Sequence, residues 1–322
     1  MTNQANNVSR KKSRNLIGKV FREIQRIFSL ITSKNYQFLR FSAPGHFYSP
    51  IPDISEIHSN ADTLFDKSIK DIPGVDLNDS GQLKLAQNFT KYYGDIRFSK
   101  EKKEGARYYY HNEYFCYGDS IALYSMMRHF EPKQIFEVGS GFSSAAMLDT
   151  DDQFLGGKTR FTFIEPYAAR LYSLLTEKDK ERCKIIEKPV QTVSPEEFRV
   201  LDKNDILFID SSHIGKIHSD FLHLILNVLP ALKPGVIIHF HDIFWPLEYP
   251  MEWLDEGKAF NEAYFLRTFL QYNNQFEVLY FNSYMEYHHA DFLKNNLPQM
   301  VETPPPGNIA PSNSSLWIRK IS

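Results

Sequence analysis

The chain has 322 residues, of which 42% are hydrophobic, 15% aromatic and 24% charged, a composition typical of a folded globular protein rather than a disordered or fibrous one. Its formal net charge of −2 gives no reason to expect nucleic acid as a partner. Cys116 and Cys183 lack a metal-type spacing, and no run approaches the roughly 20 apolar residues of a membrane span. We therefore expect a cytoplasmic protein.

Residues 1–35 are predicted to form a basic amphipathic helical segment. Its apolar residues recur at helical spacing: Leu16, Ile17, Val20, Phe21, Ile24, Ile27, Phe28 and Ile31. Its charged residues are almost all basic: Arg14, Lys19, Arg22 and Arg26 against Glu23. Such a helix suits the anionic inner face of a membrane, and a docking or oligomerisation helix is the alternative. The oligomeric state stays open.

Residues 36–113 are predicted to form an irregular cover, because prolines between Pro44 and Pro73 discourage long regular elements. From Tyr114 onward the pattern changes. Over residues 114–322 short β-rich runs alternate with amphipathic stretches, which is typical of an α/β fold with a doubly wound, mostly parallel sheet of the Rossmann-like kind.

Seven strands are predicted in that part of the chain, over residues 134–138, 160–164, 183–186, 205–209, 235–240, 276–281 and 316–319. The helices between them include residues 144–150, 168–178, 219–228 and 261–271. Two longer pieces, 244–258 and 282–315, are predicted to be irregular. Insertions after late strands lie at the carboxyl edge of such a sheet, where ligands bind.

The sharpest motif runs from Ile135 to Ser144, where a hydrophobic strand passes through Gly139-Ser140-Gly141 into a helix. The glycines remove Cβ atoms that would block an approaching cofactor, and the start of the helix offers free N–H groups. A dinucleotide-binding fingerprint would have a third glycine where Ser144 stands, so an NAD(P)-dependent oxidoreductase is the weaker alternative.

This motif resembles motif I of class I S-adenosylmethionine (SAM) dependent methyltransferases, in which an acidic residue precedes Gly-x-Gly. The resemblance implies a set of cofactor-binding residues in and around the turn: Glu137, Gly139, Ser140, Gly141 and Ser143. It also implies an acidic residue at the end of the second strand for the ribose hydroxyls, which is Glu165, and an adenine contact at Gln191. The wider pattern, through Tyr117-Gly118-Asp119, looks like bacterial methyltransferases of the methyltransferase-24 type.

Two further strand ends each carry an Asp and a His, namely Asp210 with His213 and Asp242 with His241. Adjacent parallel strands deliver their carboxyl ends into one crevice, so we expect Asp210 and Asp242 to converge within reach of one divalent cation. An Asp and His pair that only bonds to loops is the alternative.

The arrangement is similar to metal-dependent O-methyltransferases of the catechol and macrolide-sugar kinds. That resemblance implies Asp210 and Asp242 as metal ligands, Asp210 also as a catalytic and cofactor-binding residue, and His213 as the general base. His241 is the third candidate ligand and stands where these families commonly use a carboxylate. A histidine there favours manganese or iron over magnesium.

The sequence therefore predicts a SAM-dependent methyltransferase that acts on a hydroxyl of a small molecule or sugar, with a divalent cation as second candidate cofactor. Trp245, Tyr249 and Trp253 are predicted either to stack on the acceptor or to pack within their insertion. The alternatives are the NAD(P)-dependent oxidoreductase and a SAM-binding protein without turnover.

Overall fold

The structure is a computed structural model that describes residues 22, 24–304 and 312–322. Its contacts divide the chain into two compact units, Met1–Ala61 and Asp62–Ser322. No helix in the described ranges has the length and apolar character needed to cross a membrane.

In the first unit, residues 24–32 are helical, and α2 (Tyr36–Phe41) and α3 (Ile54–Ser59) follow. The rest of the predicted basic helix, residues 1–21 and 23, lies outside the described residues. Of the described residues in this unit only Ser42 is buried. The unit therefore has no apolar core of its own.

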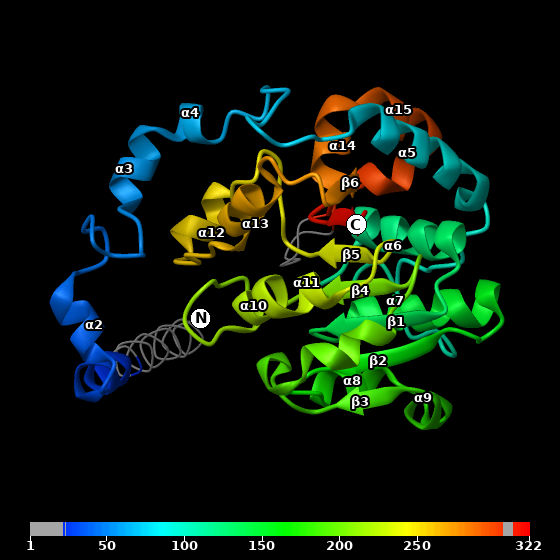
Figure 1. Cartoon of the computed structure of the whole chain (residues 1–322), viewed down its shortest axis with the longest axis horizontal. Helices are drawn as coiled ribbons and strands as arrows, with labels where there is room; N and C mark the ends of the chain where they lie inside the picture. The colour runs from blue at the N-terminus through cyan, green and yellow to red at the C-terminus, as the bar shows by residue number, and fades with distance from the viewer. Residues whose placement is uncertain (1–21, 23, 305–311) are drawn as a thin grey trace, which may run out of the picture. The chain divides into compact units, whose positions relative to one another are not determined.

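The second unit is built on a seven-stranded sheet in the order β3-β2-β1-β4-β5-β7-β6 (Figure 1). Strands β1 to β5 run parallel, and β7 is antiparallel to both of its neighbours. The strands are β1 (Gln134–Val138), β2 (Arg160–Ile164), β3 (Lys184–Ile186), β4 (Ile206–Ile209), β5 (Ile237–Phe240), β6 (Phe276–Phe281) and β7 (Leu316–Lys320). The predicted doubly wound, mostly parallel fold is confirmed.

Helices cover the sheet because its central strands are buried: every residue of β4 and β5 is buried, and all of them except His239 are apolar. From residue 61 onward the described α-helices are α4 (Ala61–Leu64), which begins at the last residue of the first unit and buries no side chain, and α5 (Asp79–Tyr93), α6 (Tyr117–Phe130), α7 (Phe142–Thr150), α8 (Ala169–Leu174), α9 (Glu177–Arg182), α10 (Asp220–His223), α11 (Leu229–Ala231), α12 (Met251–Asp255), α13 (Glu262–Leu270), α14 (Asn282–His288) and α15 (Ala290–Asn296). Shorter 3₁₀ or π-helical turns are η1 (Asp151–Leu155), η2 (Val190–Thr192), η3 (Pro195–Val200), η4 (Leu224–Val228) and η5 (Pro298–Val301). Right-handed crossovers place α7 and α8 on one face and α10, η4 and α11 on the other.

The predicted helices correspond to α7, α8, α10 with η4, and α13. The helix predicted over residues 168–178 is two helices, because α8 ends at Leu174 and Thr176 caps the start of α9. Figure 1 shows α10, α12 and α13 beyond the carboxyl end of β5. These elements therefore lie on the side of the sheet where a ligand site is expected.

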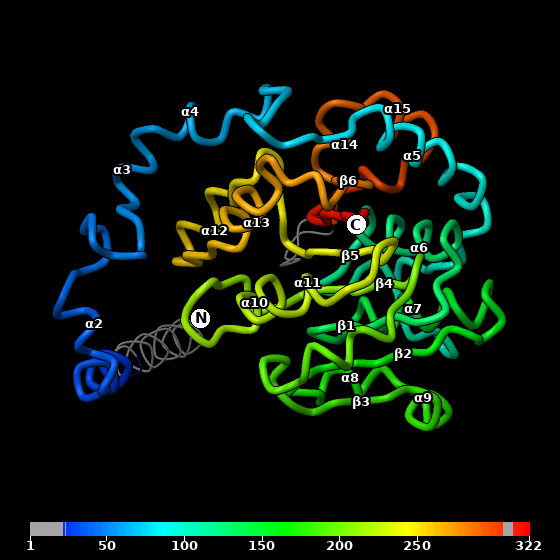
Figure 2. Tube along the Cα trace, in the orientation of Figure 1, coloured from blue at the N-terminus to red at the C-terminus, as the bar shows by residue number. Residues whose placement is uncertain are grey.

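All three regions predicted to be irregular contain helices, so those predictions were wrong; residues 244–258 hold α12. The cover region of residues 36–113 holds α5, whose buried side chains, Gln82, Leu85, Ala86 and Phe89, follow helical spacing. The piece 282–315 holds α14 and α15, and Figure 2 shows α5 running beside them. The hydroxyl of Tyr284 in α14 donates to Asp79 at 2.8 Å. Since α5 also packs on α6 and β6, the predicted domain boundary at residue 113 falls inside the second unit.

Candidate active site

Two cavities lie along the carboxyl ends of the central strands. The first has a volume of about 330 Å³ and the second about 420 Å³. Gly139, Glu165 and Asp210, which follow β1, β2 and β4, line both cavities. The register pairs Val138 with both Ile164 and Ile209, so these three strands end at one level. One elongated ligand can therefore lie across the strand ends and occupy both cavities.

The glycine turn after β1 is required first by the protein itself. Gly139 has a φ of +81°, and a Cβ atom there would collide with the backbone carbonyl oxygen of Asp210. A Cβ atom at Gly141 would lie 3.3 Å from Cδ of Arg170. The prediction that both glycines clear space for a cofactor thus describes only part of their role, because Gly139 also lets the turn pass close to the end of β4.

Glu137 lies beneath this turn and not in the wall of either cavity. Its carboxyl group accepts hydrogen bonds from the hydroxyls of Ser143, at 2.6 Å, and Ser144. Complete burial raises the pKa of Glu137 to about 8, against the effect of the serine hydroxyls. Glu137 therefore supports the turn from below. Its direct contact with a cofactor stays a prediction.

The other predicted cofactor-binding residues line the cavities. Ser140, Gly141 and Ser143 belong to the first cavity and Gln191 to the second. Glu165 accepts hydrogen bonds from the backbone N–H groups of Ser140, at 3.2 Å, and of Tyr167, at 2.7 Å. These bonds hold its carboxylate at the boundary of the two cavities.

Two carboxylates and an imidazole meet in the first cavity. Nε2 of His213 lies 3.5 Å from Oδ1 of Asp210 and 3.5 Å from Oδ2 of Asp242. Among the described residues, Asp210, His213 and Asp242 are the group that could hold a metal ion. Each offers one ligand atom, and these three atoms lie within 4.8 Å of one another. His241 lines the cavity, with Nε2 3.7 Å from Oδ1 of Asp242, but is not part of that group.

The backbone at this group is strained. His213 has a φ of +59° and Asp242 a φ of +57°, both in the left-handed region that non-glycine residues seldom adopt. Such strain persists where the surrounding structure enforces it, and it gathers at functional sites. It supports a functional role for both side chains.

Glu262 contacts this group of Asp210, His213 and Asp242, although no sequence motif pointed to it. It is the first residue of α13, is buried, and its Oε2 lies 2.9 Å from Nδ1 of His213. Burial alone would lower the pKa of His213, but the hydrogen bond and charge of Glu262, with the charges of Asp242 and Asp210, raise it to about 10. A protonated imidazole has no free lone pair, so His213 must lose this proton before it can accept another proton or bind a cation. Its predicted role as base stays a prediction.

Aromatic and basic side chains form the remaining wall of the first cavity. The guanidinium of Arg170 lies 3.7 Å from the ring centre of Tyr114, and Nζ of Lys258 lies 4.5 Å from that of Trp253. Phe260 lies beside them. Trp253 was predicted as an acceptor contact, whereas Arg170, Lys258 and Phe260 come from segments without a motif.

The two other aromatic residues predicted to contact the acceptor are buried elsewhere. Nε1 of Trp245 donates to the carbonyl of Lys67 at 3.0 Å. The hydroxyl of Tyr249 accepts from the backbone N–H of Ala263 at 3.1 Å. Tyr249 packs on Phe244 and Trp253 within the insertion, as the alternative predicted. Trp245 packs instead on Tyr284 and His288 of α14 and lines a separate cavity.

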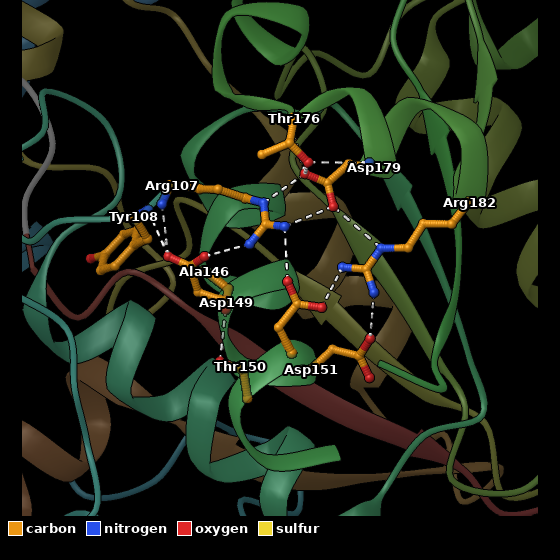
Figure 3. A network of polar contacts seen from close by, with 10 residues as sticks. Arg107, Tyr108, Ala146, Asp149, Thr150, Asp151, Thr176, Asp179 and Arg182 are labelled. Carbon is orange, nitrogen blue, oxygen red and sulfur yellow. Dashed lines mark hydrogen bonds and ion pairs between the residues drawn. The ribbon is translucent and has the colours of Figure 1, made fainter. Parts of the chain in front are cut away.

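A buried ion-pair network anchors the segment that leads into this wall (Figure 3). The Arg107 guanidinium contacts Asp149 at 2.7 Å, Asp152 at 2.8 Å and Asp179 at 2.7 Å. The backbone N–H groups of Arg107 and Tyr108 both donate to Asp149. Residues 107–116, which we call the strap, then carry residues 113–115 to the first cavity.

Comparisons with known proteins agree with these features. Residues 136–243 match the model of a family described as "Methyltransferase domain". An uncharacterized protein from Archaeoglobus fulgidus is 31% identical over 192 residues, which are 57% of this chain and 86% of that protein. The family match over residues 136–243 contains the glycine turn, Glu165, Asp210, His213 and Asp242.

Two solved structures are similar at low identity. The methyltransferase PaMTH1 from Podospora anserina, bound to S-adenosylhomocysteine (SAH), has 16% identity and a TM-score of 0.37, with 85% of this chain and 99% of that chain covered. The O-methyltransferase TomG from Streptomyces achromogenes, in complex with SAM, has 12% identity and a TM-score of 0.39, with 82% and 96% covered. Because these TM-scores are low, the fold is assigned from the strand order of this chain itself.

The sheet order, the glycine turn and the family match together define the class of protein. Residues 136–243 form a methyltransferase domain by this match, which favours a methyltransferase over the oxidoreductase alternative.

Proposed function

We propose that the chain transfers the methyl group of SAM to a hydroxyl oxygen of a small molecule or sugar. One observation carries the proposal: the glycine turn and the carboxylates of Asp210 and Asp242 line the same cavity. A cofactor on the turn and an acceptor at the carboxylates would thus be neighbours. Holding both reactants in line is the main contribution an enzyme makes to such a transfer.

In this proposal SAM lies across both cavities. Its adenine occupies the second cavity beside Gln191, and the carboxylate of Glu165 accepts hydrogen bonds from the ribose hydroxyls. Its methionine part follows Ser140 to Ser143 in the first cavity. Arg170, which packs over Gly141, supplies a positive charge for the carboxylate of the cofactor.

The residues present fit a divalent cation. Asp210 and Asp242 offer the oxygen ligands that such ions prefer, and Nε2 of His213 offers a nitrogen that suits manganese or iron. Glu262 holds Nδ1 of His213, as the partner of a metal-bound histidine commonly does. A cation bound there supplies positive charge that lowers the pKa of the acceptor hydroxyl. His241 stays a candidate for a further ligand.

The size of the first cavity and its walls describe the acceptor. About 330 Å³ leaves room for a small molecule beside the methionine part of SAM. Trp253 and Phe260 line this space, and such aromatic side chains suit a flat ring or a sugar. They would also exclude water from the reacting atoms.

The cofactor assignment is tested by calorimetry of SAH binding. Glu165→Ala removes a charge-assisted contact, so we expect a loss of roughly 1.5 to 3 kcal/mol, or about ten- to a hundredfold in affinity. Glu187→Ala is the matched control, because Glu187 also follows a strand, β3, but lines neither cavity. Equal affinity of the Glu165 variant and wild type would refute the placement of the ribose.

The transfer itself is tested by screening hydroxylated acceptors with methyl-labelled SAM in the presence of manganese or magnesium. We expect label to appear on oxygen. A protein that binds SAH tightly yet methylates no acceptor in the screen would support the non-catalytic alternative.

A further inference from the structure

The N-terminal unit carries a charge opposite to that of the rest of the chain. Residues 1–61 contain nine Lys and Arg residues and three acidic residues, Glu23, Asp53 and Glu56. The whole chain has 37 Lys and Arg and 39 Asp and Glu, so residues 62–322 hold 28 basic and 36 acidic residues, a formal net charge of −8. Four of the nine basic residues, Arg10, Lys11, Lys12 and Arg14, form a cluster within five positions. Such clusters attract anionic surfaces.

The described residues of this basic region expose their apolar side chains. Within the helix of residues 24–32, an exposed stripe follows helical spacing: Ile24, Ile27, Phe28 and Ile31. The side chain of Phe28 is 65% exposed. Because the first unit buries only Ser42 among its described residues, these side chains have no core within their own unit.

A second apolar group follows α2. The rings of Phe47 and Tyr48 lie 4.3 Å apart, and those of Phe41 and Tyr48 lie 5.9 Å apart. Phe47 is 81% exposed. Aromatic rings clustered beside basic residues are typical of segments that sit at the level of lipid headgroups.

From these observations we propose that the first unit docks the enzyme on an anionic lipid surface, with the stripe of residues 24–31 and the ring cluster of Phe41, Phe47 and Tyr48 inserted among the headgroups. A membrane accepts apolar rings and supplies negative charge to the interspersed basic residues, and it does so without a preformed pocket. No described helix is long and apolar enough to span the bilayer, so the contact is peripheral. This inference does not depend on the acceptor of the methyl group.

The test is flotation of the full-length protein with vesicles. At low salt, we expect the protein to float with vesicles of equimolar phosphatidylcholine and phosphatidylglycerol. With vesicles of phosphatidylcholine alone, we expect it to remain in the unbound fraction. High salt should release it, because the attraction is screened. Replacing Lys11 and Lys12 with Gln should weaken partition by roughly fivefold for each residue.

The apolar contribution is tested by Phe28→Ser and Phe47→Ser, each expected to lower partition by about tenfold or more. Leu226→Ser is the matched control, because Leu226 is 64% exposed but belongs to η4 in the second unit, and it should float like wild type. SAH affinity, measured for every variant, shows that each one is folded.

Three results would overturn the proposal. The first is a wild-type protein that ignores anionic vesicles at low salt. The second is flotation that Phe28→Ser and Phe47→Ser leave unchanged. The third is a dimer, detected by sedimentation, that Phe28→Ser dissociates in a protein that does not float; the stripe would then contact a second copy of the chain.

Discussion

At the scale of single residues, the two ring nitrogens of His213 have different partners. Glu262 holds Nδ1, so only Nε2 faces Asp210 and Asp242. The carboxylates raise the pKa of the imidazole, which opposes loss of its proton. A cation at Nε2 would replace that proton and relieve the repulsion between the two carboxylates.

Asp242→Asn is therefore expected to reduce turnover by about a hundredfold or more at a fixed manganese concentration, because an amide is a poorer ligand for a hard cation. SAH affinity should change little, since Asp242 lines the first cavity but not the second, where the adenine is proposed to bind. Turnover measured across a manganese titration, beside calorimetry with SAH, checks both statements.

The exposed Asp202→Asn is the control for that variant. If a confirmed acceptor is methylated at full rate by wild type in excess chelator, with no metal in the purified protein, the cation proposal is wrong. Asp210 and Asp242 would then be hydrogen-bonding partners of the acceptor or of His213.

Glu137 makes stability depend on pH. Its folded pKa of about 8 exceeds the ordinary value of 4.5, so the folded state keeps the proton where the unfolded chain has lost it. The stabilisation is complete below the unfolded pKa and is lost as the pH rises towards about 8. Glu137→Gln mimics the protonated carboxyl and should remove this dependence.

Urea unfolding of wild type and Glu137→Gln at about pH 5 and about pH 8 checks this prediction. As the pH rises from about 5 to about 8, the free energy of unfolding of wild type should fall by roughly 2 to 4 kcal/mol relative to that of the variant. A difference between the two proteins that stays constant with pH would show that Glu137 is ionised in the fold.

At the scale of elements, the strap of residues 107–116 connects a structural network to the cofactor cavity. Asn112 fixes its shape by donating to the carbonyl of Phe115 and accepting from the N–H groups of Tyr114 and Phe115. Arg107 fixes its start against α7 and α9 through Asp149 and Asp179. Loosening that end should let the Tyr114 wall move.

Arg107→Lys keeps the charge but loses the forked contacts. We expect the free energy of unfolding to fall by about 1 to 3 kcal/mol and SAH affinity to fall about two- to tenfold, because the strap is less well held. Arg182→Lys is the control: Arg182 contacts Asp151 and Asp179 in the same network but does not belong to the strap. Equal losses of affinity in both variants would contradict a role specific to the strap.

Strand ends were the most predictable part of the site, because an apolar run that stops at a polar residue can be read directly. Asp210 and Asp242 were found in this way, and the structure brings both to His213. Glu262 and Arg170 could not be found, since they lie on helices whose position depends on the packing of the whole sheet.

Helix α5 was not predicted for a different reason. Its buried residues had readable helical spacing, but the prolines before Asp79 led to the prediction of an irregular region. Asp119 was noticed only through the resemblance. The structure shows that it ties α6 to the two residues before β7, because it accepts hydrogen bonds from Ser314 and Ser315. A sequence motif alone does not distinguish such a tie from a ligand contact.

At the scale of the whole molecule, one unit has a core and the other does not. All the buried apolar side chains of the described residues belong to the second unit, which also contains both cavities of the site. Cooperative unfolding requires a core, so the first unit should contribute no transition of its own. Heating the full-length protein should therefore give a single calorimetric transition.

That transition should respond to the cofactor. SAH at about a hundred times its dissociation constant should add about 2.7 kcal/mol to the free energy of unfolding, which raises the midpoint by roughly 5 to 10 °C for a domain of this size. Glu165→Ala at the same SAH concentration should show a smaller rise, because less of the ligand is bound. A second transition that SAH does not move would mean that the first unit forms a core of its own. It would also weaken the argument that the exposed stripe of residues 24–31 needs a lipid surface to cover it.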